Sequence, residues 1–270
     1  MGTGLINSLL VCALAVPFAW LAVRIRVLTR GGGIMAALIA LAVVASQCWV
    51  WLAPLFLFLI SGVLLGRLNP AHGPGLKNGR TDAKHGRPRD AMQVFCNGGI
   101  YALLAVADDF HADVWMTISI CTATCDTWAS EIGMYARWPT INIATLRKVP
   151  PGLSGGISLA GSLGGFAGAM GMGLFICVIT AGHTPQPGWH VTIISGVLFV
   201  GASLWYSAFA MGGMLLDSLL GALFQPKFDD GAGVGDTGTR QVSGLRWMTN
   251  DVVNLVSNAL TVALAAALLE

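Results

Sequence analysis

Long apolar stretches separated by short polar segments run along almost the whole chain. A bilayer core needs about 20 predominantly apolar residues per helix, or somewhat fewer where the membrane thins. The stretches that meet this requirement cover residues 4–23, 91–107, 114–132, 157–180, 191–213 and 250–269. We interpret each of them as a membrane-spanning helix.

The apolar stretch 33–66 is too long for one membrane span and tight for two. The residues near its middle are typical of an interfacial turn with aromatic anchors: Gln47, Trp49, Trp51 and Pro54. We therefore divide the stretch into helices 33–47 and 50–66. The pattern predicts an all-α, polytopic transmembrane helical bundle of about eight helices, or seven if one short span is re-entrant.

All fifteen Lys and Arg residues fall on one side of the membrane in this arrangement. With the N-terminus outside, they all lie in the inner loops 24–32, 67–90, 133–156 and 214–249. A single helix in place of the divided stretch would put the first two basic clusters on opposite sides. The positive-inside rule makes the basic side cytoplasmic. We predict one transmembrane domain over residues 1–270, with cytoplasmic loops 67–90, 133–156 and 214–249.

Composition agrees with lipid as the main solvent of this chain. Hydrophobic residues make up 55% of it and charged residues only 10%, whereas a soluble domain carries about a quarter charged residues. The six Cys lie in apolar stretches without the spacing of a metal site or a disulfide framework, so we interpret them as packing thiols. The first twenty residues lack a basic n-region and a cleavage site, which indicates a retained helix. No nucleic-acid partner is expected, and the oligomeric state stays open.

Five carboxylates lie at one depth, near the cytoplasmic ends of four predicted helices. Asp90 begins the helix 91–107, and Asp126 and Glu131 lie in the inner half of the helix 114–132. Asp217 follows the helix 191–213, and Asp251 opens the helix 250–269. Ionisable groups inside membrane helices are costly and usually functional. Packed carboxylates repel one another unless cations share the site, and hard oxygen ligands suit Mg²⁺. A proton or Na⁺ pathway would use similar residues.

Amides and hydroxyls extend these acids into polar stripes at helical spacing. Asn97 continues the stripe that begins at Asp90, and Asn254 continues the one that begins at Asp251. Such stripes must face the interior of the bundle, because lipid cannot satisfy them. Hydrogen bonding between helices is the simpler explanation for any one of these polar residues.

A second constellation begins at Arg147 and Lys148, passes through two prolines and continues as Gly-Leu-Ser-Gly-Gly over residues 152–156. We expect Ser154, Gly155 and Gly156 to open the helix 157–180, where free backbone N–H groups bind anions. Close helix packing is the usual reason for such a run, but Lys148 beside it favours phosphate. Lys84, Arg87 and Arg89 could add phosphate contacts, or they could serve membrane topology alone.

Several sequence motifs together resemble those of one family of integral membrane proteins, and they occur in the same order as in that family. They are GRPRDAMQVFCNGG, CDTWASEIG, RKVPPGLSGGISLAGSLGG, GGMLLDSLLGALFQ and TNDVVNLVSN, spread over residues 31 to 269. The family includes transmembrane protein 19 and the plastid phytyl-phosphate kinase of vitamin E synthesis. Trp128 departs from the family's acidic element, and its indole is expected to narrow a lipid groove.

The resemblance implies an isoprenoid monophosphate kinase that makes a prenyl or phytyl diphosphate at the expense of a nucleoside triphosphate. CTP is the favoured donor by analogy with other polyisoprenoid kinases. Matched by motif, the expected site contains Asp90, Asn97, Asp126, Glu131, Ser154 to Gly156, Asp217, Asp251 and Asn254. We expect Asp126, Glu131 and Asp217 to hold Mg²⁺, the amides of Ser154, Gly155 and Gly156 with Lys148 to cradle a phosphate, and Arg89 to neutralise charge in transit.

Other classes remain open at this stage. A cation- or proton-coupled transporter would also carry intramembrane acids and Gly-interrupted helices, but its site would lie near the midplane. A CDP-alcohol phosphotransferase would carry four Asp over two consecutive helices, a signature that this sequence lacks. A structural membrane protein would explain the acids poorly. The compact size favours a prokaryotic inner membrane with the site facing the cytoplasm.

Overall fold

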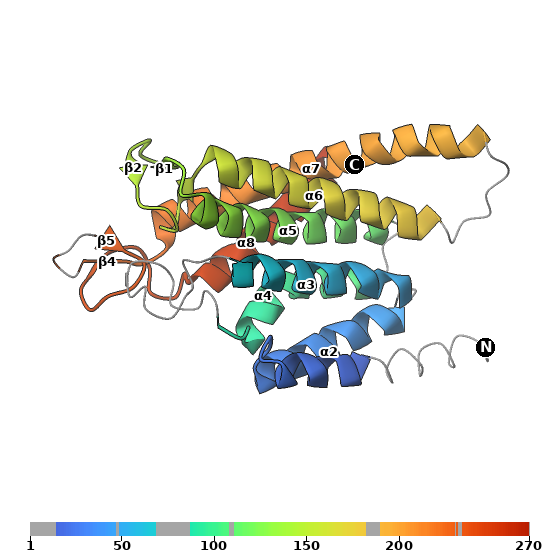
Figure 1. Cartoon of the computed structure of the whole chain (residues 1–270), viewed down its shortest axis with the longest axis horizontal. Coiled ribbons are helices and arrows are strands. Elements are labelled where there is room, and N and C mark those ends of the chain that lie inside the picture. Colours follow the sequence, from blue (N-terminus) through green and yellow to red (C-terminus); the bar gives the residue numbers. More distant parts are fainter. Residues whose placement is uncertain are drawn as a thin grey trace.

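The computed structural model describes residues 15–46, 49–68, 87–107, 111–181, 190–229, 231 and 234–269. Eight helices make up most of this part of the chain (Figure 1). They are Ala15–Arg24, α2 Arg30–Ser46, α3 Leu52–Leu68, α4 Ala91–Val106, α5 Ala112–Ala136, α6 Leu159–Ala181, α7 His190–Phe224 and α8 Asn250–Leu269. The predicted all-α bundle of eight helices is thus confirmed, and so is the division of the stretch 33–66.

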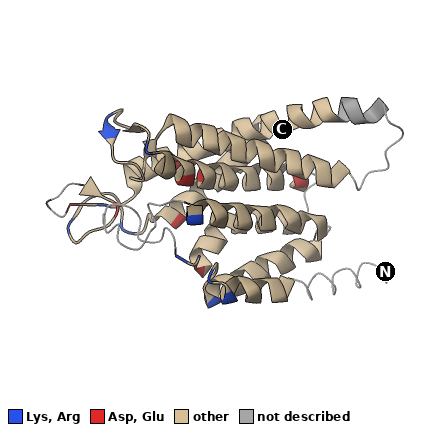
Figure 2. Ribbon diagram, viewed as in Figure 1, with Lys and Arg blue, Asp and Glu red and all other residues tan. Residues whose placement is uncertain are grey.

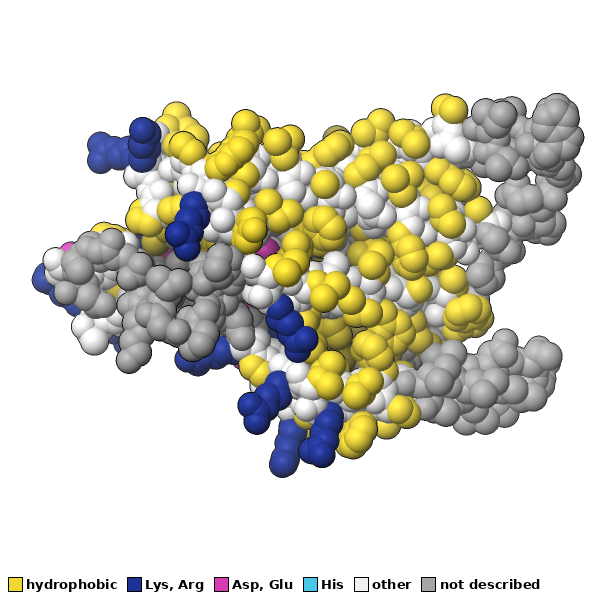
Figure 3. All heavy atoms as spheres, viewed as in Figure 1, with side chains coloured by type: hydrophobic (Ala, Val, Ile, Leu, Met, Phe, Trp, Pro, Cys, Tyr) yellow, Lys and Arg dark blue, Asp and Glu magenta, His cyan; other side chains and the backbone are white. Residues whose placement is uncertain are grey.

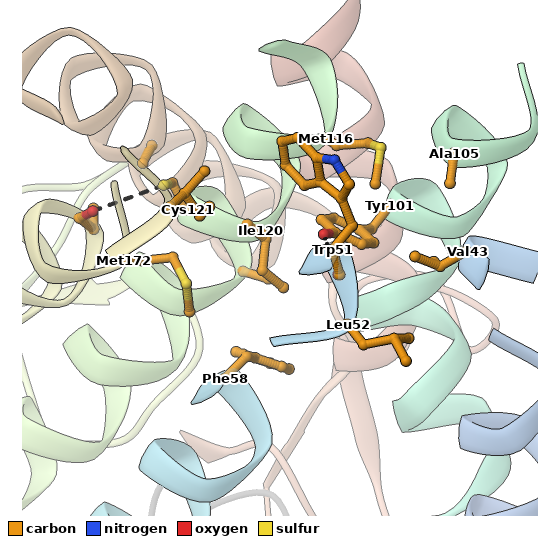
Figure 4. Packing of buried hydrophobic residues seen from close by; sticks show 14 of the residues in the cluster. Val43, Trp51, Leu52, Phe58, Tyr101, Ala105, Met116, Ile120, Cys121 and Met172 are labelled. Carbon is orange, nitrogen blue, oxygen red and sulfur yellow. Dashed lines mark hydrogen bonds between the residues drawn. The ribbon is translucent and has the colours of Figure 1, made fainter. Parts of the chain in front are cut away.

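A short 3₁₀ helix, Trp49–Trp51, forms the predicted turn between α2 and α3. The hydroxyl of Tyr101 on α4 donates a hydrogen bond to the carbonyl of Trp51 at 2.6 Å, and both side chains are buried. Figure 4 shows them beside Val43, Leu52 and Met116 in the apolar core. The turn is therefore anchored from inside the bundle.

α5 lies at the centre of the bundle and packs against α3, α4, α6, α7 and α8. It carries several buried hydroxyls, which lipid could not satisfy. Those of Thr117, Thr122 and Thr124 donate to the carbonyls four residues earlier, at 2.7, 2.8 and 2.7 Å. Local bonds of this kind let polar side chains lie in an apolar interior.

The contact between α5 and α6 depends on small residues. A β-carbon at Gly161 or Gly165 would lie 2.8 Å from the carbonyl oxygen of Ala129 or Cys125, closer than real β-carbons approach. Small residues let membrane helices pack with their backbones in close contact. The free thiols follow the predicted packing role, since Cys96, Cys121 and Cys125 are buried. Cys12 and Cys48 lie outside the described residues.

Within the described residues, two small antiparallel sheets lie at one end of the bundle, in the segments predicted as the loops 133–156 and 214–249 (Figure 1). The first has the order β2-β1-β3 and the second β5-β4-β6. The strands are β1 Thr140–Asn142, β2 Lys148–Val149, β3 Gly156–Ile157, β4 Lys227–Asp229, β5 Val234–Gly235 and β6 Gln241–Ser243. Both sheets follow directly from helices that reach this end, α5 and α7.

Two helices extend farther than predicted. α5 continues to Ala136 and α7 to Phe224, so the segments that begin the predicted loops 133–156 and 214–249 are helical. Asp217 therefore lies within α7 and not beyond its end. Its neighbours are mainly apolar, and the carboxylate faces a polar cavity, which lets the helix continue past it. Most of the predicted loop 67–90, including Lys84, lies outside the described residues.

The surface of the described chain has the polarity expected in a membrane. Apolar side chains cover the visible face of the bundle in Figure 3, and Leu103, Leu163 and Val197 expose more than half of their surface. The Lys and Arg residues drawn in Figure 2 gather at the end that carries the two sheets. Among the described residues, four helical stretches are long and apolar enough to cross a membrane, and three shorter apolar helices accompany them. The chain is an integral membrane protein.

Candidate functional site

A polar cavity of about 550 Å³ opens at the charged end of the bundle. It lies among α3, α4, α5, α6, α7, α8 and the turn that leads into β3. Nine of the predicted site residues line it: Arg89, Asn97, Asp126, Glu131, Ser154, Gly155, Gly156, Asp217 and Asn254. Residues from distant parts of the sequence thus meet at one place, as the polar stripes predict.

Asp126 on α5 and Asp217 on α7 face the cavity close enough for their negative charges to repel each other. Ser257 donates its hydroxyl to Asp217 Oδ2 at 2.9 Å. The side-chain amide of Asn254 donates to the same oxygen at 3.0 Å when its nitrogen is turned toward Asp217. α8 therefore fixes the orientation of one carboxylate, and Asp126 lines the same cavity from α5.

This acidic pair is the part of the site that fits a divalent cation. Within the described ranges, no group of three or more His, Cys, Asp or Glu residues is arranged to hold a metal ion. Mg²⁺ commonly binds through one or two carboxylates, with phosphate oxygens and waters completing its shell. Asp126 and Asp217 match that pattern, whereas Glu131, the third expected ligand, lies beside Arg89.

Arg89 lies just before α4 and is held by its backbone and its side chain. Its N–H donates to Val27 O at 2.9 Å, and its carbonyl accepts from Thr29 N–H at 3.0 Å. The guanidinium lies over the Phe58 ring, 5.2 Å from the centroid, in a space left by Gly62. Burial lowers the pKa of Arg89, and the charge of Glu131 opposes that effect. Since a guanidinium stays protonated in proteins, the site holds a fixed positive charge.

The Gly-rich turn is built differently from the prediction. Ser154 and Gly155 precede strand β3, and α6 begins only at Leu159, so the turn does not open the helix. The Ser154 N–H donates to Asp236 Oδ2 at 2.8 Å, and the Gly156 N–H donates to Leu153 O at 2.9 Å. Two of the three expected phosphate-binding amides are therefore engaged within the protein.

Gly155 is explained by close packing, which the sequence analysis gave as the usual reason for a Gly-rich run. Its φ of +84° favours glycine, and a β-carbon there would lie 2.5 Å from the Cβ of Ala222 on α7. The turn thus packs closely against α7 and brings the Ser154 side chain to the cavity wall. Close packing, and not a helix N-terminus, explains the glycine.

Lys227 and Asp236 form a buried ion pair that sequence reasoning missed. Lys227 Nζ lies 2.8 Å from Asp236 Oδ1 and donates to the Ser154 carbonyl at 2.9 Å. The Ser154 hydroxyl contacts the ammonium and donates to Asp236 Oδ1 at 2.6 Å. Burial lowers the pKa of Lys227, and the charge of Asp236 opposes that effect. The pair ties the second sheet to the Gly-rich turn.

Three predicted residues do not line the cavity. Lys148 is exposed on β2 and is not among the residues that line the cavity, so its role as a phosphate contact stays a prediction. Asp90 caps α4: its carboxylate accepts from Gln93 N–H at 3.0 Å while the Gln93 side chain accepts from Asp90 N–H at 3.1 Å. Asp251 is buried in the first turn of α8. Asp90 and Asp251 therefore belong to the framework of the site.

Three further arginines line the cavity, although the sequence analysis explained most of them by membrane topology. They are Arg26, Arg67 and Arg87. Their clustering beside helix ends was the available signal. Trp128 packs beside Gly168 of α6 and donates from Nε1 to the Ser61 hydroxyl at 3.2 Å. It therefore lies between α3 and α6.

Comparison with known proteins gives the family. Residues 13–262 match the integral membrane protein family DUF92. An uncharacterized membrane protein of Methanocaldococcus jannaschii is 28% identical over 225 residues, which cover 82% of this chain and 83% of that protein. The chloroplastic protein VTE6 of Arabidopsis thaliana is 28% identical over 142 residues, which cover 53% of this chain and 33% of VTE6.

A second Arabidopsis thaliana relative, protein PGR, is 27% identical over 209 residues, covering 66% of this chain and 68% of PGR. No solved structure gives a significant match. The family match extends over nearly all the described helices and includes every residue that lines the polar cavity. The chain belongs to the DUF92 family of integral membrane proteins.

Proposed function

We propose that the protein is an isoprenoid monophosphate kinase of the membrane. It transfers the γ-phosphoryl group from a nucleoside triphosphate to a prenyl or phytyl monophosphate. The products are the prenyl or phytyl diphosphate and the nucleoside diphosphate. The observation that carries this proposal is the polar cavity at the charged end of the apolar bundle, which is lined by Asp126, Asp217 and the half-buried Arg89.

The position of the cavity suits an amphiphilic substrate. A prenyl phosphate has a hydrocarbon tail that belongs in the bilayer and an anionic head that belongs at the interface. Arg26, Arg67, Arg87 and Arg89 line the cavity and would attract that head. The resemblance to a family that includes a plastid phytyl-phosphate kinase supports the same substrate class.

The chemistry needs little beyond positioning and charge neutralisation. Phosphoryl transfer passes through a transition state whose charge is spread over the phosphoryl oxygens. Asp126 and Asp217 would hold Mg²⁺, which would neutralise part of that charge when bound. Arg89 would orient the acceptor phosphate. The acceptor is already anionic, so no side chain has to remove a proton from it.

The donor nucleotide and the side of the membrane belong to the same proposal. CTP is the donor that the family resemblance favours. The one-sided basic residues favour a cytoplasmic site under the positive-inside rule, and a prokaryotic inner membrane is the proposed location. Prenyl phosphate, nucleotide and membrane lipids would then be the partners of this protein.

Transport is the rival function, and the interior of α5 weighs against it. The middle of this helix, from Met116 to Cys125, is buried and carries no charged residue. The hydroxyls of Thr117, Thr122 and Thr124 donate to carbonyls of their own helix, and α5 lines the polar cavity only from Asp126 onward.

Purified protein in detergent tests the proposal directly. It would be incubated with γ-labelled ATP, GTP, CTP or UTP and with geranyl, farnesyl, geranylgeranyl or phytyl monophosphate, with and without Mg²⁺. We expect labelled prenyl diphosphate to form with Mg²⁺ and not to form when EDTA is present. Absence of product in every combination would refute kinase activity, and nucleotide-independent solute uptake by proteoliposomes would favour a transporter.

A further inference from the structure

A second, apolar cavity of about 80 Å³ lies beside the polar one. Its walls come from the first helix, α2, α3 and α4. The side chains that line it include Phe18, Ala36, Ile39, Leu55 and Leu59. Apart from the residues that it shares with the polar cavity, these walls offer hydrocarbon alone to an occupant.

The two cavities meet at three side chains. Arg89, Gln93 and Asn97 line both of them. Phe58 lies on the apolar side, with the Arg89 guanidinium over its ring. A molecule that bridges the junction would therefore meet a positive charge at one end and an apolar wall immediately beyond it.

The helices around the apolar cavity differ in how closely they pack. α2 packs along α4, and α2 and α3 diverge from their turn toward the charged end (Figure 1). Phe18 and Phe56 close one wall with an edge-to-face contact, 4.4 Å between ring centroids. The apolar cavity is thus lined by α2 and α3, which make few contacts with each other.

We propose that this cavity binds the first carbons of the hydrocarbon chain of a lipid monophosphate whose phosphate lies against Arg89. The inference rests on the proposed function and assigns the tail to one route among the helices. An apolar cavity of about 150 Å³ binds benzene, which has six carbons, so one of about 80 Å³ accommodates about three carbons of a chain. The remaining carbons would continue between α2 and α3 into the bilayer.

Photolabelling of the wild-type protein tests the route without requiring phosphoryl transfer. A farnesyl monophosphate with a diazirine in its first isoprene unit would be irradiated with the protein in nanodiscs, without nucleotide. We expect mass spectrometry to locate the label in the helices that line the apolar cavity, namely the first helix, α2, α3 and α4, and an excess of unmodified farnesyl monophosphate to prevent it. Competable labelling confined to α5, α6, α7 or α8 would overturn the proposal.

A matched pair of variants tests the cavity itself. Ala36→Phe would fill it, whereas Ala37→Phe adds the same bulk to the same helix at a half-buried position that does not line it. We expect Ala36→Phe to reduce farnesyl monophosphate binding about tenfold or more and Ala37→Phe to leave it near wild type. Equal effects of the two variants would overturn the proposal.

The outcomes separate this inference from the proposed function. Competable labelling of the helices that line the apolar cavity, without any diphosphate product, would support the tail site and overturn the kinase. Diphosphate formation with labelling elsewhere would support the kinase and overturn the tail site. If Ala36→Phe fails to fold, the wild-type label map still decides the route.

Discussion

Arg89 lies where the polar and the apolar cavities meet, and glycines on α3 make room for its side chain. A β-carbon at Gly62 would collide with the guanidinium, and one at Gly66 would lie 3.6 Å from Glu131 Oε1, an ordinary contact. The two glycines are one helical turn apart. Their different surroundings provide a way to move Arg89 without removing its charge.

Gly62→Ala should displace the guanidinium while the helix remains intact. A charge-assisted hydrogen bond is worth about 1.5–3 kcal/mol, so we expect the KM for the prenyl monophosphate to rise about tenfold. The measurement is steady-state kinetics in detergent, with thermal unfolding as a check on folding. Gly66→Ala is the control and should change KM by less than about twofold. Equal KM values for the two variants would show that the position of Arg89 does not matter.

At the scale of elements, the second sheet is fastened to the Gly-rich turn by the ion pair of Lys227 and Asp236. Both side chains are buried, with 8% and 3% of their surface exposed. The pair also holds the Ser154 backbone and hydroxyl. The sheet β4–β6 and the turn before β3 should therefore loosen together when the pair is broken.

Asp236→Asn should leave a buried ammonium without its counter-charge. Loss of one partner of a buried pair costs about 3–5 kcal/mol, so the melting temperature in detergent should fall by several degrees. Limited proteolysis should cut the segment between β4 and β6 faster than in the wild type. Asp229→Asn changes a carboxylate of the same sheet that accepts from the exposed Gly231 N–H at 2.8 Å, and it should have little effect. A stable Asp236→Asn protein would contradict the role given to the pair.

The elements differ in how far the sequence alone could predict them. Lipid cannot satisfy free backbone groups, so spanning segments must be helical and their apolar pattern is easy to recognise. The extension of α7 was missed because Asp217 resembles the end of an apolar stretch. The strands are two or three residues long, too short for a recognisable alternation of polar and apolar positions.

The candidate site was predictable where it contains ionisable residues that are energetically costly in a membrane. Asp126, Asp217 and Arg89 are ionisable groups at membrane helices, and such groups are seldom tolerated without a role. The choice between Lys148 and Lys227 was not predictable, because both are basic residues of polar loops. Tertiary packing decides that Lys148 faces solvent on β2 and that Lys227 is buried against Ser154.

At the scale of the whole molecule, the basic residues and the polar cavity share one end of the bundle (Figure 2). Positive charge on a membrane protein favours the cytoplasmic side. If that rule applies here, the opening of the cavity and the two sheets face the cytoplasm. The opposite end carries the start of α5, with His111 and Asp113 exposed.

Cysteine labelling can test this orientation. In a cysteine-free background, Ser243→Cys places a thiol on the exposed edge of β6, and His111→Cys places one at the other end of the bundle. A membrane-impermeant maleimide should label Ser243→Cys in inside-out vesicles and His111→Cys in intact cells. Each variant is the control for the other, and the reverse pattern would place the cavity outside.

The central claim, that the acidic pair serves phosphoryl transfer to a lipid monophosphate, is tested most directly by the rate of labelled prenyl diphosphate formation in an Asp126→Asn protein. The matched control is Asp113→Asn, which changes an exposed carboxylate on the same helix, at the end remote from the cavity. We predict that Asp126→Asn lowers kcat at least about a hundredfold because the metal loses a ligand, and that Asp113→Asn keeps the wild-type rate. Wild-type diphosphate formation by Asp126→Asn would contradict the account.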